Sequence, residues 1–276
     1  MKLVCIDVDG TIIDHNQRVP ASAAEAIKQA VANGHILVMC TGRSHPEIYP
    51  KLWDLGFRGL IGANGAFVEY DNEVMDTHLI PHPEIQRITQ VLEAAHAHWV
   101  WQSHDRIVPS RSYYEAFQAA TEEGKQAEGL NGDWSEYVTQ IEPYVTWDLP
   151  KDSSKCTFTI PTDSPLTFEQ VTSQIGGDYL LIPGSVSVGG ITTELTAQHV
   201  TKGEGLRKLA QHLGINMADT IGIGDSANDI PMLETSGLGI AMGNGIDEVK
   251  KVANWVAPAL EDNGLAAALD HAGLTA

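Results

Sequence analysis

Two aspartates stand two residues apart in Asp7-Val-Asp9-Gly10-Thr11, directly after the first apolar run of the chain. Side chains at positions i and i+2 of a strand point to the same side, so both carboxylates can face one point. Two like charges held so close raise a pKa or require a cation nearby. A plain strand end entering a turn is the alternative, because Asp and Gly are common there. Alone, the motif leaves both interpretations open.

Two further segments could bind an anion. In Cys40-Thr41-Gly42-Arg43, a hydroxyl and backbone N–H groups follow another apolar run, and such groups at a helix start suit a phosphate. The alternative makes Thr41 a plain helix N-cap. Lys202 precedes a helix expected at 203–213, where a cation opposes the helix dipole, so a nearby anion would explain it. A solvated lysine is the alternative there.

A second acidic segment, Gly224-Asp225-Ser-Ala-Asn228-Asp229, follows an apolar run in the last third of the chain. Two carboxylates and an amide in a strand-to-helix loop could bind Mg²⁺ through oxygen. The stretch 222–227 also fits the glycine fingerprint of dinucleotide sites, with an acidic candidate at 247 or 248. We disfavour that interpretation, because Asp225 would face a pyrophosphate without a counter-charge and only about 50 residues remain for the second half of a sheet.

The elements that must position these residues form two sets of short apolar runs. Buried strands are expected at 2–6, 35–40, 59–61, 220–224, 238–242 and 254–257. A helix is expected to begin at a capping box, Ser22 to Glu25, and to end at Gly34; a second ends at Gly214. This order predicts an α/β fold with a doubly wound, mostly parallel, Rossmann-like sheet. Ligands of such sheets lie at the carboxyl ends of the strands, where the polar motifs stand.

The middle of the chain has a different character. We expect an inserted α+β domain at 83–190, within a discontinuous core formed by 1–82 and 191–276. The alternating stretch 155–160 predicts a strand with one solvated face. Trp99 and Trp101, with three histidines nearby (His96, His98 and His104), could form a stacking or metal cluster, but tryptophan more often fills a core.

Composition excludes several function classes. With 17 basic and 36 acidic residues the net charge is −19, which argues against binding to nucleic acid or to an anionic membrane. No apolar run approaches the roughly 18 residues of a membrane span, and the apolar N-terminal run is broken at once by aspartates. Three cysteines without metal-ligand spacing indicate a reduced, cytoplasmic protein.

Taken together, the four polar segments resemble the motifs of the haloacid dehalogenase superfamily, and within it the Cof-type phosphatases with a large α/β cap domain. Asp7 to Thr11 is similar to the first motif, Thr41 to the second, Lys202-Gly203 to the third and Gly224 to Asp229 to the fourth. Weaker similarities are Asn64-Gly65-Ala66, Ala241 to Asn244 and Glu261 to Gly264. The order and spacing agree, and so does the long insertion between the second and third motifs.

The resemblance implies a Mg²⁺-dependent phosphatase acting on a small phosphorylated metabolite, such as a sugar phosphate or a phosphorylated cofactor. Asp7 would attack phosphorus to form an aspartyl-phosphate, and Asp9 would serve as general acid and then as general base. Mg²⁺ would be held by Asp7, Asp225 and the main-chain carbonyl of Asp9. Lys202 would offset phosphate charge; Thr41, Gly42 and Asn228 would hold phosphate oxygens, and Asp229 would orient Lys202 or a metal-bound water.

Two alternatives stay open at this point. A phosphomutase would use the same nucleophile and return the phosphoryl group to another hydroxyl. A phosphate-sensing module would be a non-enzyme on the same fold, although it has no need of an acid/base at Asp9. The sequence leaves the physiological substrate and the oligomeric state undetermined.

Overall fold

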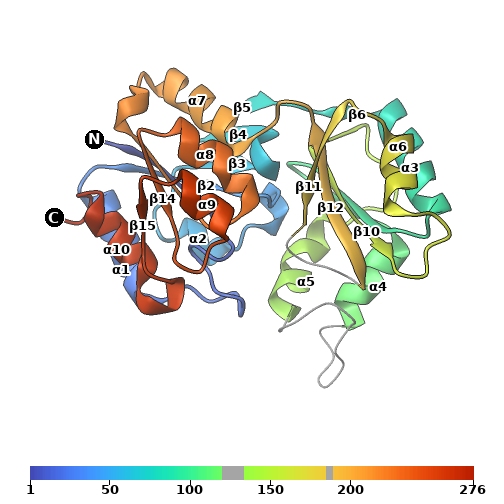
Figure 1. Cartoon of the computed structure of the whole chain (residues 1–276), viewed down its shortest axis with the longest axis horizontal. Helices are drawn as coiled ribbons and strands as arrows, with labels where there is room; N and C mark the ends of the chain where they lie inside the picture. The colour runs from blue at the N-terminus through green and yellow to red at the C-terminus, as the bar shows by residue number, and fades with distance from the viewer. Residues whose placement is uncertain (120–133, 185–188) are drawn as a thin grey trace. The chain divides into compact units, whose positions relative to one another are not determined.

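The computed structural model describes residues 1–119, 134–184 and 189–276 (Figure 1). The chain divides into two compact units. The first unit contains Met1–Arg43, Tyr49–Thr77 and Val200–Ala276, and the second contains Ser44–Ile48 and His78–His199. The segment 83–190, expected as an inserted domain, lies within the second unit, which begins earlier and ends later along the chain.

The first unit is built on an eight-stranded sheet with the order β15-β14-β13-β1-β2-β3-β4-β5. Neighbouring strands from β15 to β3 are parallel, and β4 and β5 complete one edge as an antiparallel pair. The strands are β1 (Leu3–Ile6), β2 (Ile36–Cys40), β3 (Gly59–Gly62), β4 (Phe67–Tyr70), β5 (Glu73–Thr77), β13 (Thr220–Gly224), β14 (Leu238–Ala241) and β15 (Trp255–Val256). The predicted α/β class with a mostly parallel sheet is confirmed.

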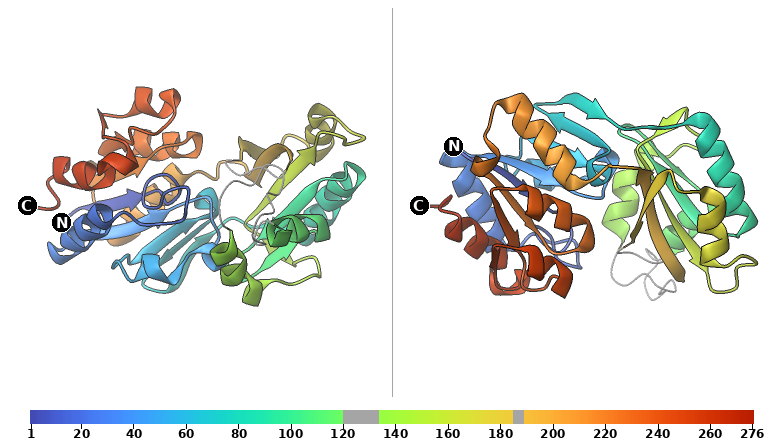
Figure 2. Two further views of the ribbon diagram at one scale, coloured as in Figure 1. Left: turned by 90° about the horizontal axis from the view of Figure 1, so that it is seen from below. Right: turned by 45° about the horizontal axis from the view of Figure 1, so that its top comes forward.

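Helices cover both faces of this sheet (Figures 1 and 2). Leu3 and Cys5 point to one face of β1 and Val4 and Ile6 to the other, and all four are fully buried, as a strand covered on both sides requires. The helices are α1 (Ala21–Ala32), α2 (Pro50–Trp53), α7 (Lys202–Leu213), α8 (Ile230–Thr235), α9 (Asp247–Val252) and α10 (Gly264–His271). No helix in the described ranges is both long enough and apolar enough to span a membrane.

The start of α1 differs from the prediction. The helix begins at Ala21, directly after Pro20, and no side chain caps it. Ser22 already lies inside the first turn, so it cannot act as the N-cap of a capping box, and that detail of the prediction is wrong. The other end agrees, because Gly34 follows the C-cap residue Asn33 with a φ of +83°, a conformation that glycine adopts without strain.

The second unit is an α+β structure. Its main sheet is antiparallel with the order β11-β12-β10-β7-β8, and a two-stranded sheet pairs β6 with β9. The strands are β6 (Ile80–Pro81), β7 (His98–Gln102), β8 (Ile107–Pro109), β9 (Asp152–Ser153), β10 (Lys155–Pro161), β11 (Tyr179–Pro183) and β12 (Gly190–Ala197). The helices are α3 (His82–Ala94), α4 (Arg111–Ala119), α5 (Ser135–Ile141) and α6 (Phe168–Ile175).

One face of this sheet packs against α3 and α6 in an apolar core that includes Trp99, Trp101 and Phe158. The opposite face of β10 was expected to be solvated, and this is wrong, since Lys155 and Thr159 are almost completely buried. Their polar atoms are instead paired across the sheet. Lys155 Nζ lies 2.8 Å from Glu194 Oε1, and the Thr159 hydroxyl lies 2.7 Å from that of Thr192. Mutual pairing lets an alternating strand bury its polar side.

Candidate active site

Asp7 and Lys202 meet at the carboxyl ends of the central strands. The parallel ladder between β1 and β13 continues one step beyond β1, where the Asp7 N–H donates to the Ile223 carbonyl at 2.9 Å. Lys202 opens α7, and its Nζ donates to Asp7 Oδ1 and to Asp229 Oδ1, each at 2.6 Å. The expectation that a nearby anion explains this lysine is therefore met by two carboxylates, and the solvated alternative is wrong.

Burial strongly affects the protonation of the charged groups in this cluster. Asp7 is 4% exposed, and neither Lys202 nor Asp229 is exposed at all. Burial, reinforced by the Asp229 charge, holds the pKa of Asp7 well above its usual range despite the opposing effect of Lys202. Burial also disfavours the charged lysine, but Asp229 and Asp7 outweigh it and raise the pKa of Lys202. The lysine therefore stays charged, while the carboxylates around it remain in excess.

Asp225 adds a third carboxylate to the cluster. One oxygen each of Asp7, Asp225 and Asp229 lie within 4.8 Å of one another. Burial and the Asp229 charge raise the pKa of Asp225 to about 7. Its Oδ1 is buried and has no hydrogen-bond partner in the described part of the chain. A buried acceptor without a donor, in a set of hard oxygen ligands, fits a divalent cation such as Mg²⁺.

Asp229 differs from Asp7 and Asp225 because both of its carboxylate oxygens accept hydrogen bonds from the protein. While its Oδ1 accepts from Lys202, its Oδ2 accepts from the backbone N–H groups of Asp225 and Ser226, both at 3.0 Å. A carboxylate engaged at both oxygens orients its neighbours more readily than it ligates an ion. Asp229 therefore contacts the lysine and the 225–226 loop, and its predicted role of orienting Lys202 or a metal-bound water stays a prediction.

Gly10 brings the first motif close to Asp225. It adopts a φ of +84°, and a Cβ at this position would stand 2.3 Å from Asp225 Oδ2. Only glycine combines this backbone conformation with such a close approach. The Asn244 side chain spans the same gap, since its Nδ2 donates to the Gly10 carbonyl at 2.8 Å. The polar segment after β14 therefore belongs to the site, although its similarity in sequence is weak.

Asp9 is held by an arginine that the sequence analysis did not single out. Arg43 Nε donates to Asp9 Oδ2 at 2.9 Å and its Nη2 to Asp9 Oδ1 at 2.6 Å, a bidentate pair. The same Nη2 also donates to Gln17 Oε1 at 2.6 Å, and the guanidinium lies over the Tyr49 ring. Burial opposes the charge of Arg43, but Asp9 outweighs it and raises the pKa of Arg43. The sequence did offer a signal for this residue, because Arg43 directly follows Thr41 and Gly42 in the second motif.

The phosphate-binding candidates lie on adjoining loops. Thr41 follows β2 and is buried, and its hydroxyl accepts from the Arg43 N–H at 3.1 Å across Gly42, so it shapes a turn and is not a helix N-cap. Asn228 stands in the loop after β13, and its Nδ2 donates to Asn64 Oδ1 at 2.9 Å. Asn64 belongs to the loop after β3, and its backbone N–H donates to the Thr41 carbonyl at 3.0 Å. The three loops are thus joined by hydrogen bonds.

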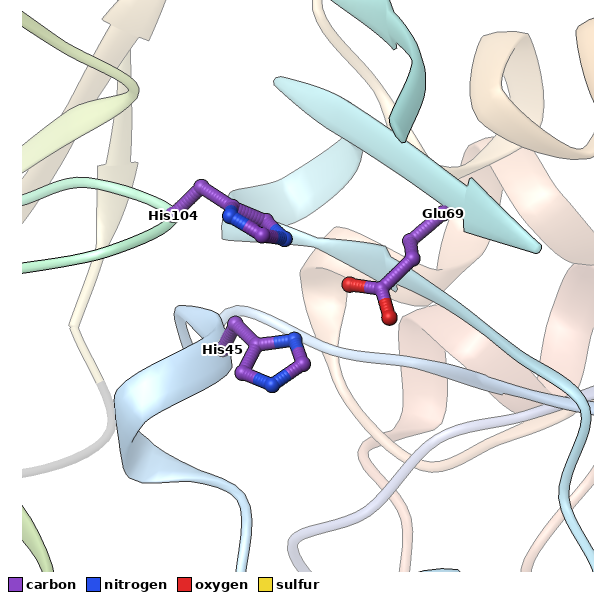
Figure 3. Close-up of side chains that lie close together, drawn as sticks. All are labelled: His45, Glu69 and His104. Atoms are coloured by element: carbon purple, nitrogen blue, oxygen red, sulfur yellow. The ribbon is translucent and has the colours of Figure 1, made fainter. Parts of the chain in front are cut away.

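The tryptophan–histidine cluster considered from the sequence is not formed. Trp99 and Trp101 lie in the apolar core of the second unit, where Trp101 Nε1 donates to the Thr89 hydroxyl. His104 instead lies beside His45, with ring centroids 4.9 Å apart and planes inclined by 51° (Figure 3). Figure 3 also draws Glu69, a residue of β4 in the first unit. The alternative, that Trp99 and Trp101 fill a hydrophobic core, is therefore correct.

Comparison with known proteins places the chain in a family. The model of the haloacid dehalogenase-like hydrolases matches residues 4–269. The chain belongs to this family. It is 27% identical over 287 residues to phosphatase YwpJ of Bacillus subtilis, covering 98% of this chain and 99% of the relative. It is also 27% identical over 285 residues to 5-amino-6-(5-phospho-D-ribitylamino)uracil phosphatase YwtE of the same organism, covering 98% of both chains.

Solved structures agree on the fold. The haloacid dehalogenase subclass IIB sugar phosphatase BT4131 superposes with a TM-score of 0.75 at 22% identity, over 99% of this chain and 100% of that one. The predicted family, its Cof-type branch and the hydrolase class of phosphatases are confirmed. A module that only senses phosphate does not agree with this membership.

Proposed function

We propose that this protein is a Mg²⁺-dependent phosphatase that hydrolyses a small phosphorylated metabolite through an aspartyl-phosphate on Asp7. The observation that carries the proposal is the buried Lys202, fixed between Asp7 and Asp229 beside the unpartnered oxygen of Asp225. Such a site has one fixed cation and a surplus of carboxylates, so it can take up a divalent cation together with the anionic substrate.

The chain's own residues divide the reaction into two steps. In the first, the Asp7 carboxylate forms a bond to phosphorus while the bond to the leaving oxygen breaks, and Asp9 donates a proton to that oxygen. In the second, Asp9 accepts a proton from water as the water oxygen attacks phosphorus, and the bond to Asp7 breaks to release inorganic phosphate. The ion pair with Arg43 holds the Asp9 carboxylate in place for both proton transfers.

The remaining groups neutralise and orient the phosphate. Lys202 offsets its charge while retaining Asp229 as a partner, and Thr41, Gly42 and Asn228 hold its oxygens in line for displacement. Asp7, Asp225 and the main-chain carbonyl of Asp9 would hold Mg²⁺, whose positive charge would let two anions approach each other.

The names of two similar proteins support a proposal for the substrate class. YwtE is named for a phosphorylated ribitylamino-uracil, and BT4131 is described as a sugar phosphatase. Both names describe phosphate on a small polyhydroxylated carbon skeleton. We therefore propose a sugar phosphate or a phosphorylated cofactor precursor as the substrate.

The test is release of inorganic phosphate from p-nitrophenyl phosphate and from a panel of phosphorylated sugars and cofactor precursors. Activity should require added Mg²⁺ and be lost in EDTA. Asp225→Asn should require far more Mg²⁺, whereas Asp270→Asn, an exposed substitution in α10, is the matched control and should behave as wild type. Full activity in EDTA would exclude the metal, and transfer to a second hydroxyl without phosphate release would favour the mutase.

A further inference from the structure

The loop between β3 and β4 has an unusual backbone. Ala63, Asn64 and Gly65 follow one another with φ values of +49°, +60° and +102°. Asn and Gly tolerate positive φ, but alanine in this region is strained. Strain of this kind persists only where the surroundings enforce it, and it concentrates at functional sites. The proposed mechanism so far gives this loop no task.

The backbone of this loop touches the second motif and the residue that precedes the third. The Ala63 N–H donates to the Arg43 carbonyl at 2.8 Å, and the Asn64 N–H donates to the Thr41 carbonyl at 3.0 Å. Gly65 packs against the residue before Lys202, since a Cβ there would stand 2.3 Å from the Thr201 carbonyl oxygen. The loop is therefore braced against the second and third motifs.

The side chain of Asn64 reaches the fourth motif. It is 1% exposed, and its Oδ1 accepts from Asn228 Nδ2 at 2.9 Å. On the other side of the same amide, the Ser226 hydroxyl donates to Asn228 Oδ1 at 2.9 Å. A donor at the amide oxygen and an acceptor at the amide nitrogen fix the position of the Asn228 side chain and determine which end carries the oxygen. The second N–H of Nδ2 has no partner among the described residues.

We infer that Asn64 is a positioning residue, which holds the Asn228 amide so that its second N–H is kept for the substrate phosphate. This inference rests on the proposed function, because it assigns a support to one of the phosphate-binding groups. The strained loop then has a purpose. It must place one buried carbonyl oxygen within hydrogen-bond distance of Asn228 while staying anchored to Thr41 and Thr201.

The test is a double-mutant cycle read out by binding of inorganic phosphate. Asn64→Gly tolerates the positive φ and removes the side chain that carries the acceptor, so it should weaken phosphate binding about tenfold, the value of one hydrogen bond. Asn228→Ala should weaken it by a similar factor. The double variant should be no worse than Asn228→Ala alone, because Asn64 acts through Asn228.

The matched control is Ala63→Gly in the same loop, which relieves backbone strain and removes one buried methyl group but no polar side-chain atom. It should bind phosphate within about twofold of wild type. Phosphate affinity is measured by isothermal titration calorimetry in Mg²⁺ buffer, and folding of each variant by urea unfolding. If Asn64→Gly does not fold, Asn64→Asp retains an acceptor, and in that background Asn228→Ala should still cost about tenfold.

Additive losses in the double variant, or equal losses in Ala63→Gly and Asn64→Gly, would overturn the inference and leave the loop a purely structural support. Unchanged phosphate affinity in Asn64→Gly would overturn it as well. These outcomes are separate from a failure of the proposed function. In that case the wild-type protein would bind phosphate but release none from any substrate, and the coupling between Asn64 and Asn228 would still be measurable.

Discussion

Each unit of this protein buries a lysine beside a carboxylate, and among the described residues only the lysine of the first unit adjoins a group of three aspartates. Lys155 in the second unit lies 2.8 Å from Glu194, on a sheet face where threonines pair with one another. Lys202 in the first unit lies 2.6 Å from both Asp7 and Asp229. Asp225 adds a further carboxylate beside it, whereas Glu194 belongs to no such acidic group among the described residues.

The difference separates a structural pair from a reactive site. A buried ion pair such as Lys155–Glu194 holds a particular packing, although its net contribution to stability is small. An acidic surplus around one lysine instead raises the pKa of Asp7 and of Asp225, because the extra negative charge is unfavourable in a buried place. A bound divalent cation would offset this surplus of negative charge. The same residue types therefore signal stability in one unit and chemistry in the other.

The largest expected effect comes from Asp7→Asn. Without the nucleophilic carboxylate, turnover of p-nitrophenyl phosphate should fall about 10³-fold or more. In EDTA the variant should unfold at a higher urea concentration than wild type, since the substitution removes a buried charge that burial and Asp229 disfavour. Steady-state kinetics and urea unfolding measure the two effects. Wild-type turnover in this variant would disprove the proposed mechanism.

Substitution of Asp9 should reduce turnover less than substitution of Asp7, and the reduction should depend on the leaving group. Asp9→Asn should lower kcat about 10²-fold or more for an alkyl or sugar phosphate, whose leaving oxygen needs a proton, and less for p-nitrophenyl phosphate. Arg43→Gln should lower kcat about tenfold for the alkyl or sugar phosphate and less for p-nitrophenyl phosphate, because Arg43 holds the Asp9 carboxylate. The measurement compares kcat on the two substrates for each variant and for wild type. Equal losses on both substrates would argue against proton transfer by Asp9.

Lys155→Met probes the Lys155–Glu194 ion pair of the second unit. The substitution removes a buried cation from beside the half-buried Glu194 and should lower the free energy of unfolding by about 3 kcal/mol, as measured in urea. Combining it with Glu194→Leu should recover much of the loss, because the carboxylate that lost its lysine is then removed. Stabilisation by Mg²⁺ should be unchanged in both variants. A loss of the Mg²⁺ response would mean that the two lysines are not independent.

The smallest effect concerns His98 on β7. Burial lowers the pKa of His98, so the folded protein favours the neutral ring. The stability that this ring contributes is present above its unfolded pKa of about 6.5 and is lost as the pH falls through that value towards the folded pKa. Wild type should therefore lose more stability than His98→Gln between pH 7.5 and 5.5, by less than about 1 kcal/mol because the ring is partly solvated. Parallel urea curves measure the difference.

Local patterns predicted much of the core. The buried strands β1, β2 and β13 were recognised to within a residue or two, because continuous apolar runs that end in polar residues have few other interpretations. The start of α1 was misplaced, since Ser22-Ala-Ala-Glu25 imitates a capping box and Pro20 already sets the helix boundary. The buried polar face of β10 was missed, because alternation reports two unlike faces and not whether polar partners cover one of them.

The sequence by itself determined the motif residues Asp7, Asp9, Lys202 and Asp225, their order and the class of chemistry they suit. Only the tertiary structure decided which of them touch. Lys202 and Asp7 are 195 positions apart, and no local pattern fixes a 2.6 Å contact at that separation. The Arg43–Asp9 pair and the Asn64–Asn228 contact were decided in the same way, because neighbouring parallel strands bring distant loops to one edge of the sheet.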